Sequence, residues 1–220
     1  SNAATAATAN ATVLAFVPCK GGSGATFLAA NLAYALSAQG DCKVALFDLN
    51  LQFGDALLFL TEQKAAHTLS DVVQGIHRLD VALLKTSMVS VAPNLDVLAA
   101  PADPSQAMDI KPEHIDALVR LARRHYDYII LDIGHALDAP TIQALDKADK
   151  IYAVLQSTLP FIGGAKRMLE IFQKLEYPES KTELILNRYE TSCDVNAKAI
   201  QLSRGKPSGS TRPNHYDAAI

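Results

Sequence analysis

The chain is long enough for one compact domain and carries no strong charge bias. Its 220 residues are 49% hydrophobic and 20% charged, which is enough apolar material for a sizeable core and too much for a disordered chain. The net charge is -3 and like charges form no run, so nucleic acid, which clustered cations bind, is not expected as a direct partner. No stretch approaches the roughly 18 apolar residues of a membrane-spanning helix. Three cysteines without a Cys-x-x-Cys pair indicate a reducing, cytoplasmic compartment.

Both ends of the chain are expected to be irregular. Ser1 to Ala3 is typical of the remnant of a removed expression tag, and the small, uncharged residues that continue to position 11 are typical of a linker. Either a further domain upstream or a frayed natural terminus explains that linker. The folded domain is expected over residues 12–220, with a mobile Gly/Pro/Ser loop from Arg204 to Arg212.

Short apolar runs alternate with helical patterns through the rest of the chain. Strands are predicted at residues 13–17, 43–48, 95–99, 128–131, 151–155 and 183–186. Apolar residues recur at helical spacing from Leu28 to Leu36, from Ile115 to Ala122 and from Ile162 to Phe172. Strands that are apolar on both faces need cover on both faces. The pattern therefore predicts a single-domain α/β fold, with a mostly parallel sheet and helices on both faces.

Residues with binding chemistry follow several of these strands directly. They are the segment from Lys20 to Thr26, then Asp48, Asp132 and Asn187. Right-handed crossovers place the carboxyl ends of parallel strands on one edge of the sheet, where ligands bind in such folds. We therefore expect these residues to converge in space.

A glycine-rich turn between the first strand and the first helix predicts a phosphate-binding loop. Its residues are Lys20, Gly21, Gly22, Ser23, Gly24, Ala25 and Thr26. Glycines let backbone N–H groups approach an anion, and the helix N-terminus adds partial positive charge. Thr26 is placed to offer its hydroxyl to Mg²⁺, so ATP and Mg²⁺ are the expected ligands. The alternative is a turn that serves tight packing alone.

The loop departs from the standard pattern, which ends in Gly-Lys-Ser/Thr, because Ala25 stands at the lysine position. A charge-assisted hydrogen bond from such a lysine contributes roughly 1.5–3 kcal/mol. Its loss should weaken nucleotide binding by about one to two orders of magnitude without removing the backbone cradle.

With Lys20 at its start, the loop resembles that of the MinD/ParA family of deviant phosphate-loop ATPases, which implies their P-loop NTPase fold. In that family the leading lysine, here Lys20, reaches the phosphates of the partner in a nucleotide-sandwich dimer. Further segments resemble the pilus-assembly branch of the CpaE/TadZ type, in which an uncharged residue also occurs at the position of Ala25. They are residues 48–55, 95–101, 126–132, 186–189 and 213–216. Members of that branch usually carry a receiver-like domain upstream.

Three polar residues at strand ends define the expected metal and water chemistry. Asp132 is predicted to hold Mg²⁺ through water, or else merely to cap the next turn. The resemblance places Asp48 at an acidic position that contacts Mg²⁺ or the attacking water, and gives Lys20 and Asp48 catalytic roles. The next acidic position of the family is Asn50 here, and an amide cannot take a proton. Binding is therefore expected to survive better than turnover.

The resemblance also assigns residues to the base. Asn187 matches the residue that reads the adenine edge, although it could simply end a strand. Pro213 matches a segment near the base, and Arg188 either stacks near the base or forms a salt bridge. Gly163 and Gly164, near the start of a helix, form a second anion nest or, more simply, allow close helix packing.

The implied function is an ATP-binding organiser of pilus secretion machinery that dimerises with nucleotide, hydrolyses it weakly or not at all, and recruits other pilus-assembly proteins. Such a protein is cytoplasmic, at the cell pole or peripheral to the inner membrane, and touches the membrane only indirectly. One alternative is an active ATPase switch in division-site placement or partitioning. A second is a scaffold that has lost its nucleotide.

Overall fold

A computed structural model describes residues 11–189 and 210–213 of the chain. The strands in chain order are β1 (Thr12–Pro18), β2 (Val44–Leu49), β3 (Val89–Ala92), β4 (Leu95–Leu98), β5 (Tyr128–Ile133), β6 (Lys150–Gln156), β7 (Thr182–Tyr189) and β8 (Ser210–Pro213). The α-helices are α1 (Ala25–Ser37), α2 (Leu69–Gln74), α3 (Val81–Ser87), α4 (Pro112–Ala122), α5 (Ala139–Lys147) and α6 (Leu159–Lys174). Short 3₁₀ helices are η1 (Ala56–Phe59), η2 (Ile76–Arg78), η3 (Pro104–Asp109) and η4 (Glu179–Lys181).

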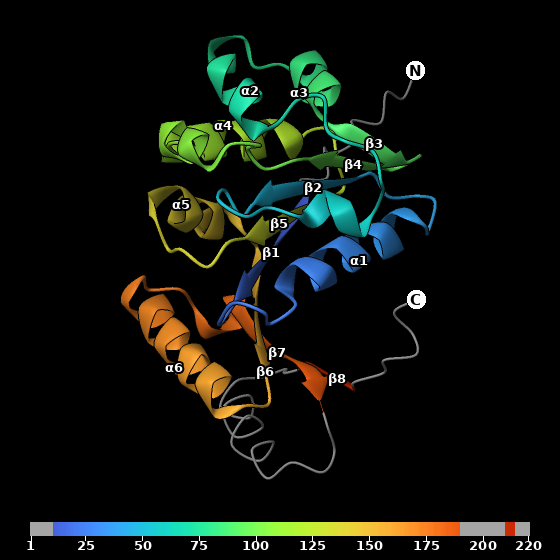
Figure 1. Cartoon of the computed structure of the whole chain (residues 1–220). Helices are drawn as coiled ribbons and strands as arrows, with labels where there is room; N and C mark the ends of the chain where they lie inside the picture. The colour runs from blue at the N-terminus through green and yellow to red at the C-terminus, as the bar shows by residue number, and fades with distance from the viewer. Residues whose placement is uncertain (1–10, 190–209, 214–220) are drawn as a thin grey trace, which may run out of the picture.

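The strands form one sheet in the order β3-β4-β2-β5-β1-β6-β7-β8 (Figure 1). Every pairing is parallel except that of β3 with β4. The short connection between β3 and β4 explains the exception, because neighbouring strands joined by a tight turn must run antiparallel. The predicted class, a mostly parallel α/β domain, is confirmed.

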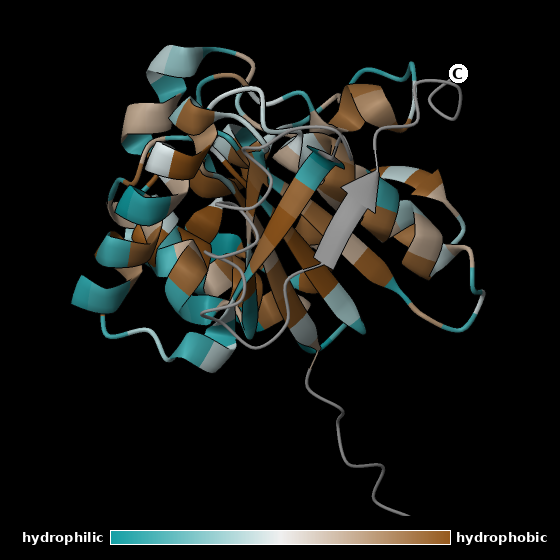
Figure 2. Ribbon diagram, turned by 90° about the horizontal axis from the view of Figure 1, so that it is seen from below, coloured by the Kyte–Doolittle hydropathy of each residue, from teal (hydrophilic) through white to brown (hydrophobic). Residues whose placement is uncertain are grey.

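Each face of the sheet has its own core. In β1, Val13, Ala15 and Val17 belong to the core under α2 to α6, while Leu14 and Phe16 belong to the core under α1 and η1. The central strands are apolar along their length and the polar residues lie on the outer helices (Figure 2). Helices therefore cover both faces, as the doubly apolar strands predicted.

The irregular ends were predicted less well than the centre. Residues 1–10 and 204–209 lie outside the described residues. The loop predicted to extend to Arg212 is wrong at its end, since β8 begins at Ser210 and pairs in parallel with β7. The residues of β8 are small or polar and show no strand periodicity. β8 forms because its backbone pairs with the edge of β7. No helix in the described part of the chain has the length and apolar composition needed to cross a membrane.

Close packing of α6 fixes the start of the glycine-rich loop. A Cβ atom on Gly164 would collide with the carbonyl oxygen of Cys19, whereas a Cβ on Gly163 would meet nothing within 4 Å. The packing interpretation of this glycine pair therefore holds at Gly164. Since Cys19 directly precedes the loop, α6 packs against the residue at which the loop begins.

We predict opposite effects for alanine at the two neighbouring glycines. Gly164→Ala should destabilise the chain by about 1–3 kcal/mol, because helix or loop must shift to admit the methyl group. Gly163→Ala should be neutral or stabilise it by up to about 1 kcal/mol, the gain expected for alanine in a helix. Chemical denaturation of both variants beside the wild type measures this, and equal stability of the two variants would contradict the packing.

Candidate functional site

The loop between β1 and α1 is shaped by two left-handed glycines. Gly22 has φ 83° and Gly24 has φ 87°, and Gly24 is the residue immediately before α1. Residues with side chains rarely adopt this conformation. Gly24 is constrained a second time, because a Cβ there would collide with the side-chain amide of Asn187.

Two amide side chains hold the loop from neighbouring strands. Gln156, the last residue of β6, donates from Nε2 to the carbonyl oxygen of Gly22 at 2.6 Å. Asn187, near the end of β7, donates from Nδ2 to the carbonyl oxygen of Ser23 at 2.9 Å. Neither amide lines the adjacent pocket, so both carbonyls are drawn away from it. Carbonyl groups that point away from the pocket suit a loop that presents its N–H groups to an anion.

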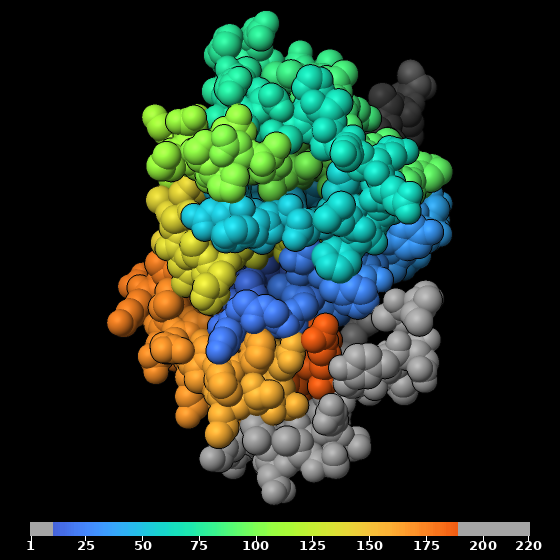
Figure 3. All heavy atoms as spheres, viewed as in Figure 1, coloured from blue at the N-terminus to red at the C-terminus, as the bar shows by residue number. Residues whose placement is uncertain are grey.

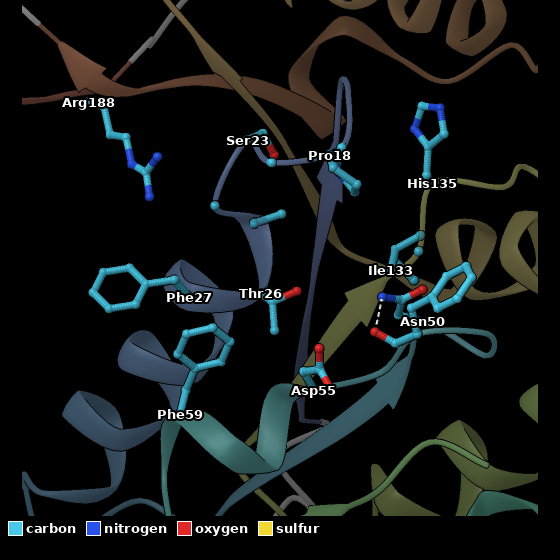
Figure 4. Close-up of a pocket in the computed structure, with 16 residues that line it drawn as sticks. Pro18, Ser23, Thr26, Phe27, Asn50, Asp55, Phe59, Ile133, His135 and Arg188 are labelled. Atoms are coloured by element: carbon cyan, nitrogen blue, oxygen red, sulfur yellow. Dashed lines mark hydrogen bonds between the residues drawn. The ribbon is translucent and has the colours of Figure 1, made fainter. Parts of the chain in front are cut away.

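The pocket beside the loop has a volume of about 480 Å³, which is within the range of nucleotide-sized sites. Its lining comes from the loop and α1, from the segment after β2, from the end of β5 and from β7: Pro18, Gly21, Gly22, Ser23, Gly24, Ala25, Thr26, Phe27, Asn50, Phe53, Asp55, Phe59, Ile133, Gly134, His135 and Arg188. In the space-filling view, the loop and α1 lie between the segment after β2 and the β6–α6 region (Figure 3). Thr26 and Ser23 lie centrally in the pocket (Figure 4).

Asp48 and Asp132 lie side by side beneath this pocket. They are register partners in the β2–β5 pair, and their exposed fractions are 2% and 0%. Burial raises the pKa of Asp48 to about 6, although N–H groups of Ala56 and Asn50 lower it. Burial also raises the pKa of Asp132 well above its ordinary value, and the negative charge of Asp48 raises it further.

The two carboxyls differ in their partners. Asp48 accepts hydrogen bonds from the backbone N–H groups of Asn50 at 3.1 Å and Ala56 at 2.9 Å, so it also fixes the turn after β2. The Thr26 hydroxyl lies close enough to Asp132 to lower its pKa. Even so, neither oxygen of Asp132 has a hydrogen bond of good geometry within the described residues.

These residues fit a nucleotide with Mg²⁺. A buried carboxyl without partners is costly, and a hydrated cation above it would satisfy both of its oxygens. Thr26 is the hydroxyl that would contact the metal, with Asp132 acting through water. The open, glycine-lined side of the loop would hold the phosphates, and a bound cation would lower the pKa of both carboxyls.

Lys20 does not line the phosphate pocket. It is exposed and lines a separate cavity of about 540 Å³ together with His135, Arg167 and the apolar residues of α6. Its neighbour Cys19 is buried, and burial raises the pKa of its thiol to about 12, as expected for a structural cysteine.

The base-binding candidates are divided between the pocket and its surroundings. Arg188 lines the pocket, whereas Asn187 lies behind the loop, with Nδ2 on Ser23 and Oδ1 accepting from the N–H of Arg188 at 3.0 Å. Pro213 ends β8, whose backbone is in register with Tyr189 of β7. The adenine roles of Asn187 and Pro213 remain predictions.

Several site residues were not found from the sequence. His135 was not singled out in the sequence, yet it lines both cavities. The loop-holding role of Gln156 and the pocket positions of Phe27 and Phe59 were also missed. Strand-end position was the available signal for His135 and Gln156, since each lies at or just beyond the carboxyl end of a parallel strand.

A strand–glycine loop–helix unit with buried acids at the ends of neighbouring strands defines a P-loop nucleotide-binding domain. The AAA domain family model matches residues 11–185. The septum site-determining protein MinD of Thermotoga maritima is 32% identical over 173 residues, which cover 78% of this chain and 62% of that protein. The chromosome partitioning protein ParA of Caulobacter vibrioides is 30% identical, over 74% of this chain and 62% of that protein. The chain thus spans about three fifths of the length of these relatives.

Solved structures give the same result. The ParA family ATPase from Chlorobium tepidum superposes with a TM-score of 0.87 at 33% identity, covering 94% of this chain and 87% of that one. MinD from Pyrococcus horikoshii, solved with Mg-ADP, superposes with a TM-score of 0.76 at 21% identity, covering 93% and 82%, and so supports the fold. The chain belongs to the MinD/ParA type of P-loop ATPases.

The buried acid pair predicts an unusual dependence of stability on pH in the absence of nucleotide. Raised pKa values mean that the folded chain binds protons that the unfolded chain releases near pH 4. The stabilisation is complete below that pH and is lost as the pH rises through about 6 for Asp48 and through the raised pKa of Asp132. Stability should therefore fall between pH 4 and pH 8.

The variant Asp132→Asn tests this dependence. It should match the wild type near pH 4 and become the more stable protein as the pH rises to 8, with a difference of a few degrees in Tm, where about 2–4 °C corresponds to 1 kcal/mol. Asp41→Asn, at an exposed position, is the matched control and should follow the wild type. Parallel pH profiles for Asp132→Asn and wild type would refute the assignment.

Proposed function

We propose that this chain binds Mg-ATP and uses it mainly to hold two copies together, with weak or absent hydrolysis. The main support is that hydrogen bonds from Gln156 and Asn187 hold the loop, although Ala25 stands where the loop lysine is expected. Those hydrogen bonds belong to the fold and do not require a bound cation. The pocket is therefore prepared for phosphates before any nucleotide arrives.

Reduced turnover is supported by the residue that faces the expected position of the attacking water. Asn50 lines the pocket, and its Nδ2 donates to the carbonyl oxygen of Phe53 at 2.8 Å (Figure 4). This hydrogen bond holds the Asn50 side chain in place, but an amide cannot accept a proton from the attacking water. With Ala25, this makes two changes that both reduce catalysis more than binding.

The position of the Lys20 side chain, outside the phosphate pocket, supports a bridging role. Because Lys20 is exposed and lines the neighbouring cavity, its ammonium group is available to a second copy rather than to its own phosphates. A ligand that contacts both copies stabilises their dimer by its differential affinity for it. Partner binding has a precedent in the solved MinC:MinD cell division complex of Aquifex aeolicus.

The cellular role that we propose is organisation of pilus-assembly machinery, on the strength of the segments that resemble the CpaE/TadZ branch. In that role the protein is cytoplasmic, works at the cell pole or beside the inner membrane, and recruits other pilus components when ATP has paired two copies. The upstream receiver-like domain of that branch belongs to the same proposal.

Sedimentation with and without Mg-ATP, run beside a phosphate-release assay, tests the proposal. Nucleotide-dependent dimers with negligible phosphate release are expected, and Lys20→Ala should lose the dimers while keeping ATP bound. Lys166→Ala, an exposed lysine on α6 that lines neither cavity, is the matched control. Dimers that persist in Lys20→Ala would contradict the bridging role.

The names of the MinD and ParA relatives favour a second candidate, an active ATPase switch in cell division or partitioning. Measurable turnover that disappears in Asp48→Asn would support it and overturn the proposal of weak hydrolysis. Asp48→Asn is preferred to Asp48→Ala because an amide oxygen can still accept from the N–H of Ala56. A chain that binds no nucleotide at all would instead be a scaffold.

Restoring the loop lysine should strengthen nucleotide binding. Ala25→Lys is expected to tighten Mg-ATP binding by roughly 1–2 kcal/mol, because the new ammonium can hydrogen-bond to the phosphates. Ala35→Lys adds the same charge at an exposed position of the same helix and should leave the affinity unchanged. Isothermal titration calorimetry measures both, and an unchanged or weaker affinity in Ala25→Lys would show that the loop does not hold phosphates.

A further inference from the structure

A second cavity adjoins the phosphate pocket and shares only His135 with it among the described residues. Its volume is about 540 Å³, which is within the range of ligand-binding sites. Three elements wall it: the start of the glycine loop, the segment after β5 and one face of α6. On α6 the lining residues Gly164, Arg167, Met168 and Ile171 lie three or four positions apart, so they share a face of the helix.

Positive charge gathers at this cavity although the chain as a whole is acidic. Lys20 and Arg167 are exposed and both line it, whereas none of the described residues that line it is acidic. The net charge of the chain is -3. Neither cation takes part in a salt bridge within the described part of the chain. His135, which lies on the side of the phosphate pocket away from Arg188 (Figure 4), adds a ring N–H. The cavity therefore favours an anion.

Apolar side chains lie deeper in the same cavity. Met168 is buried, and Leu137 and Ile171 are half-buried, whereas the two cations are exposed. Met168 belongs to the core under α6 and Leu137 packs against that core, so this apolar floor is held in place. Covering it with an apolar group would remove further apolar surface from water. The cavity therefore suits a ligand that carries a negative charge next to an apolar group.

The walls of the cavity are set by helix packing and do not require nucleotide. The helix α6 meets the loop start at Gly164, where a Cβ atom would collide with the carbonyl oxygen of Cys19. Arg167 follows less than one turn further along the same helix, so the contact at Gly164 also fixes its backbone relative to the loop start. A site that is formed before its ligand arrives loses less conformational entropy on binding.

We propose that this cavity is a docking site for a short segment of a partner protein in which an acidic residue stands next to a large apolar one. The carboxylate pairs with Arg167, whose guanidinium can hold both of its oxygens, and with Lys20. The apolar side chain covers Leu137, Met168 and Ile171. The site goes beyond the proposed function, since Arg167 has no part in holding nucleotide or in joining two copies.

The arrangement of charge and apolar surface favours a peptide over other anionic ligands. Inorganic phosphate would pair with the cations and leave the apolar floor uncovered. An anionic membrane surface binds clusters of lysine and arginine that project from a protein. Here the apolar residues Met168 and Leu137 are recessed beneath the cations, where a bilayer surface would not reach them. Neighbouring side chains of a peptide can fill the floor and meet the cations together.

Fluorescence anisotropy measures the binding with a fluorescein-labelled hexapeptide in which aspartate alternates with leucine or phenylalanine. One control peptide has asparagine in place of aspartate, and a second has serine in place of the apolar residues. The wild-type chain should bind the first peptide and bind each control more weakly by about tenfold or more, because each control lacks one of the two contacts. No binding of the first peptide, or equal binding of all three, would overturn the docking site.

The variant Arg167→Glu tests where the peptide binds. It should weaken binding by about tenfold to a hundredfold, because a charge-assisted hydrogen bond is replaced by repulsion. Lys166→Glu makes the same change of charge at the neighbouring exposed position of α6, outside both cavities, and should weaken binding by no more than about threefold. Equal losses in the two variants would show a diffuse attraction to a positive surface and would overturn the site.

Two further measurements separate this site from a membrane contact and from the proposed function. Binding to phosphatidylglycerol vesicles that is lost in Arg167→Glu, in a chain that does not bind the peptide, would assign the cavity to a membrane surface and overturn the proposal. Dimers formed with Mg-ATP by a chain that does not bind the peptide would remove the docking site and leave the proposed function. Peptide binding by a chain that binds no Mg-ATP would support the docking site and remove the proposed function.

Discussion

The hydrogen bonds from Gln156 and Asn187 to the glycine loop are the interactions on which the rest of the site depends. Each joins the end of a buried strand to a carbonyl of the loop, at 2.6 and 2.9 Å. They hold two successive residues of the loop, Gly22 and Ser23, through groups of the folded chain itself. The two apolar cores hold these strands in place, so side chains at the strand ends can hold the loop in place.

The buried acids form the second half of this arrangement. Asp48 and Asp132 lie next to each other on adjacent strands, and burial raises the pKa of each. A folded chain that keeps two carboxyls close together without a counterion stores a cost that a cation can relieve. A Mg²⁺ ion bound at this edge of the sheet would therefore stabilise the fold as well as the site. Asp48 also holds the turn between Asn50 and Ala56 in place, through the N–H groups of those two residues.

The sequence predicted the sheet, the loop and the strand-end acids because these depend on local patterns. Apolar runs identify buried strands, and glycines between a strand and a helix identify the phosphate turn. The strand β3 and the helix α5 were not identified, since Val89–Ala92 and Ala139–Lys147 are short and only weakly periodic. The end of β7 shows a further limit. Asn187 and Arg188 were identified as site residues, but the local pattern predicts neither the left-handed backbone of Arg188 nor the irregular pairing of β7 with β8.

The proposed function requires that backbone N–H groups of the loop bind a triphosphate without the loop lysine. Amide ¹⁵N–¹H spectra of the 23.6 kDa chain, recorded during a titration with Mg-ATP, measure this at each loop residue. We expect the amide signals of Gly22, Gly24, Ala25 and Thr26 to shift with nucleotide and to saturate together. Signals of these residues that stay in place while ATP binds elsewhere, or while none binds, would contradict it.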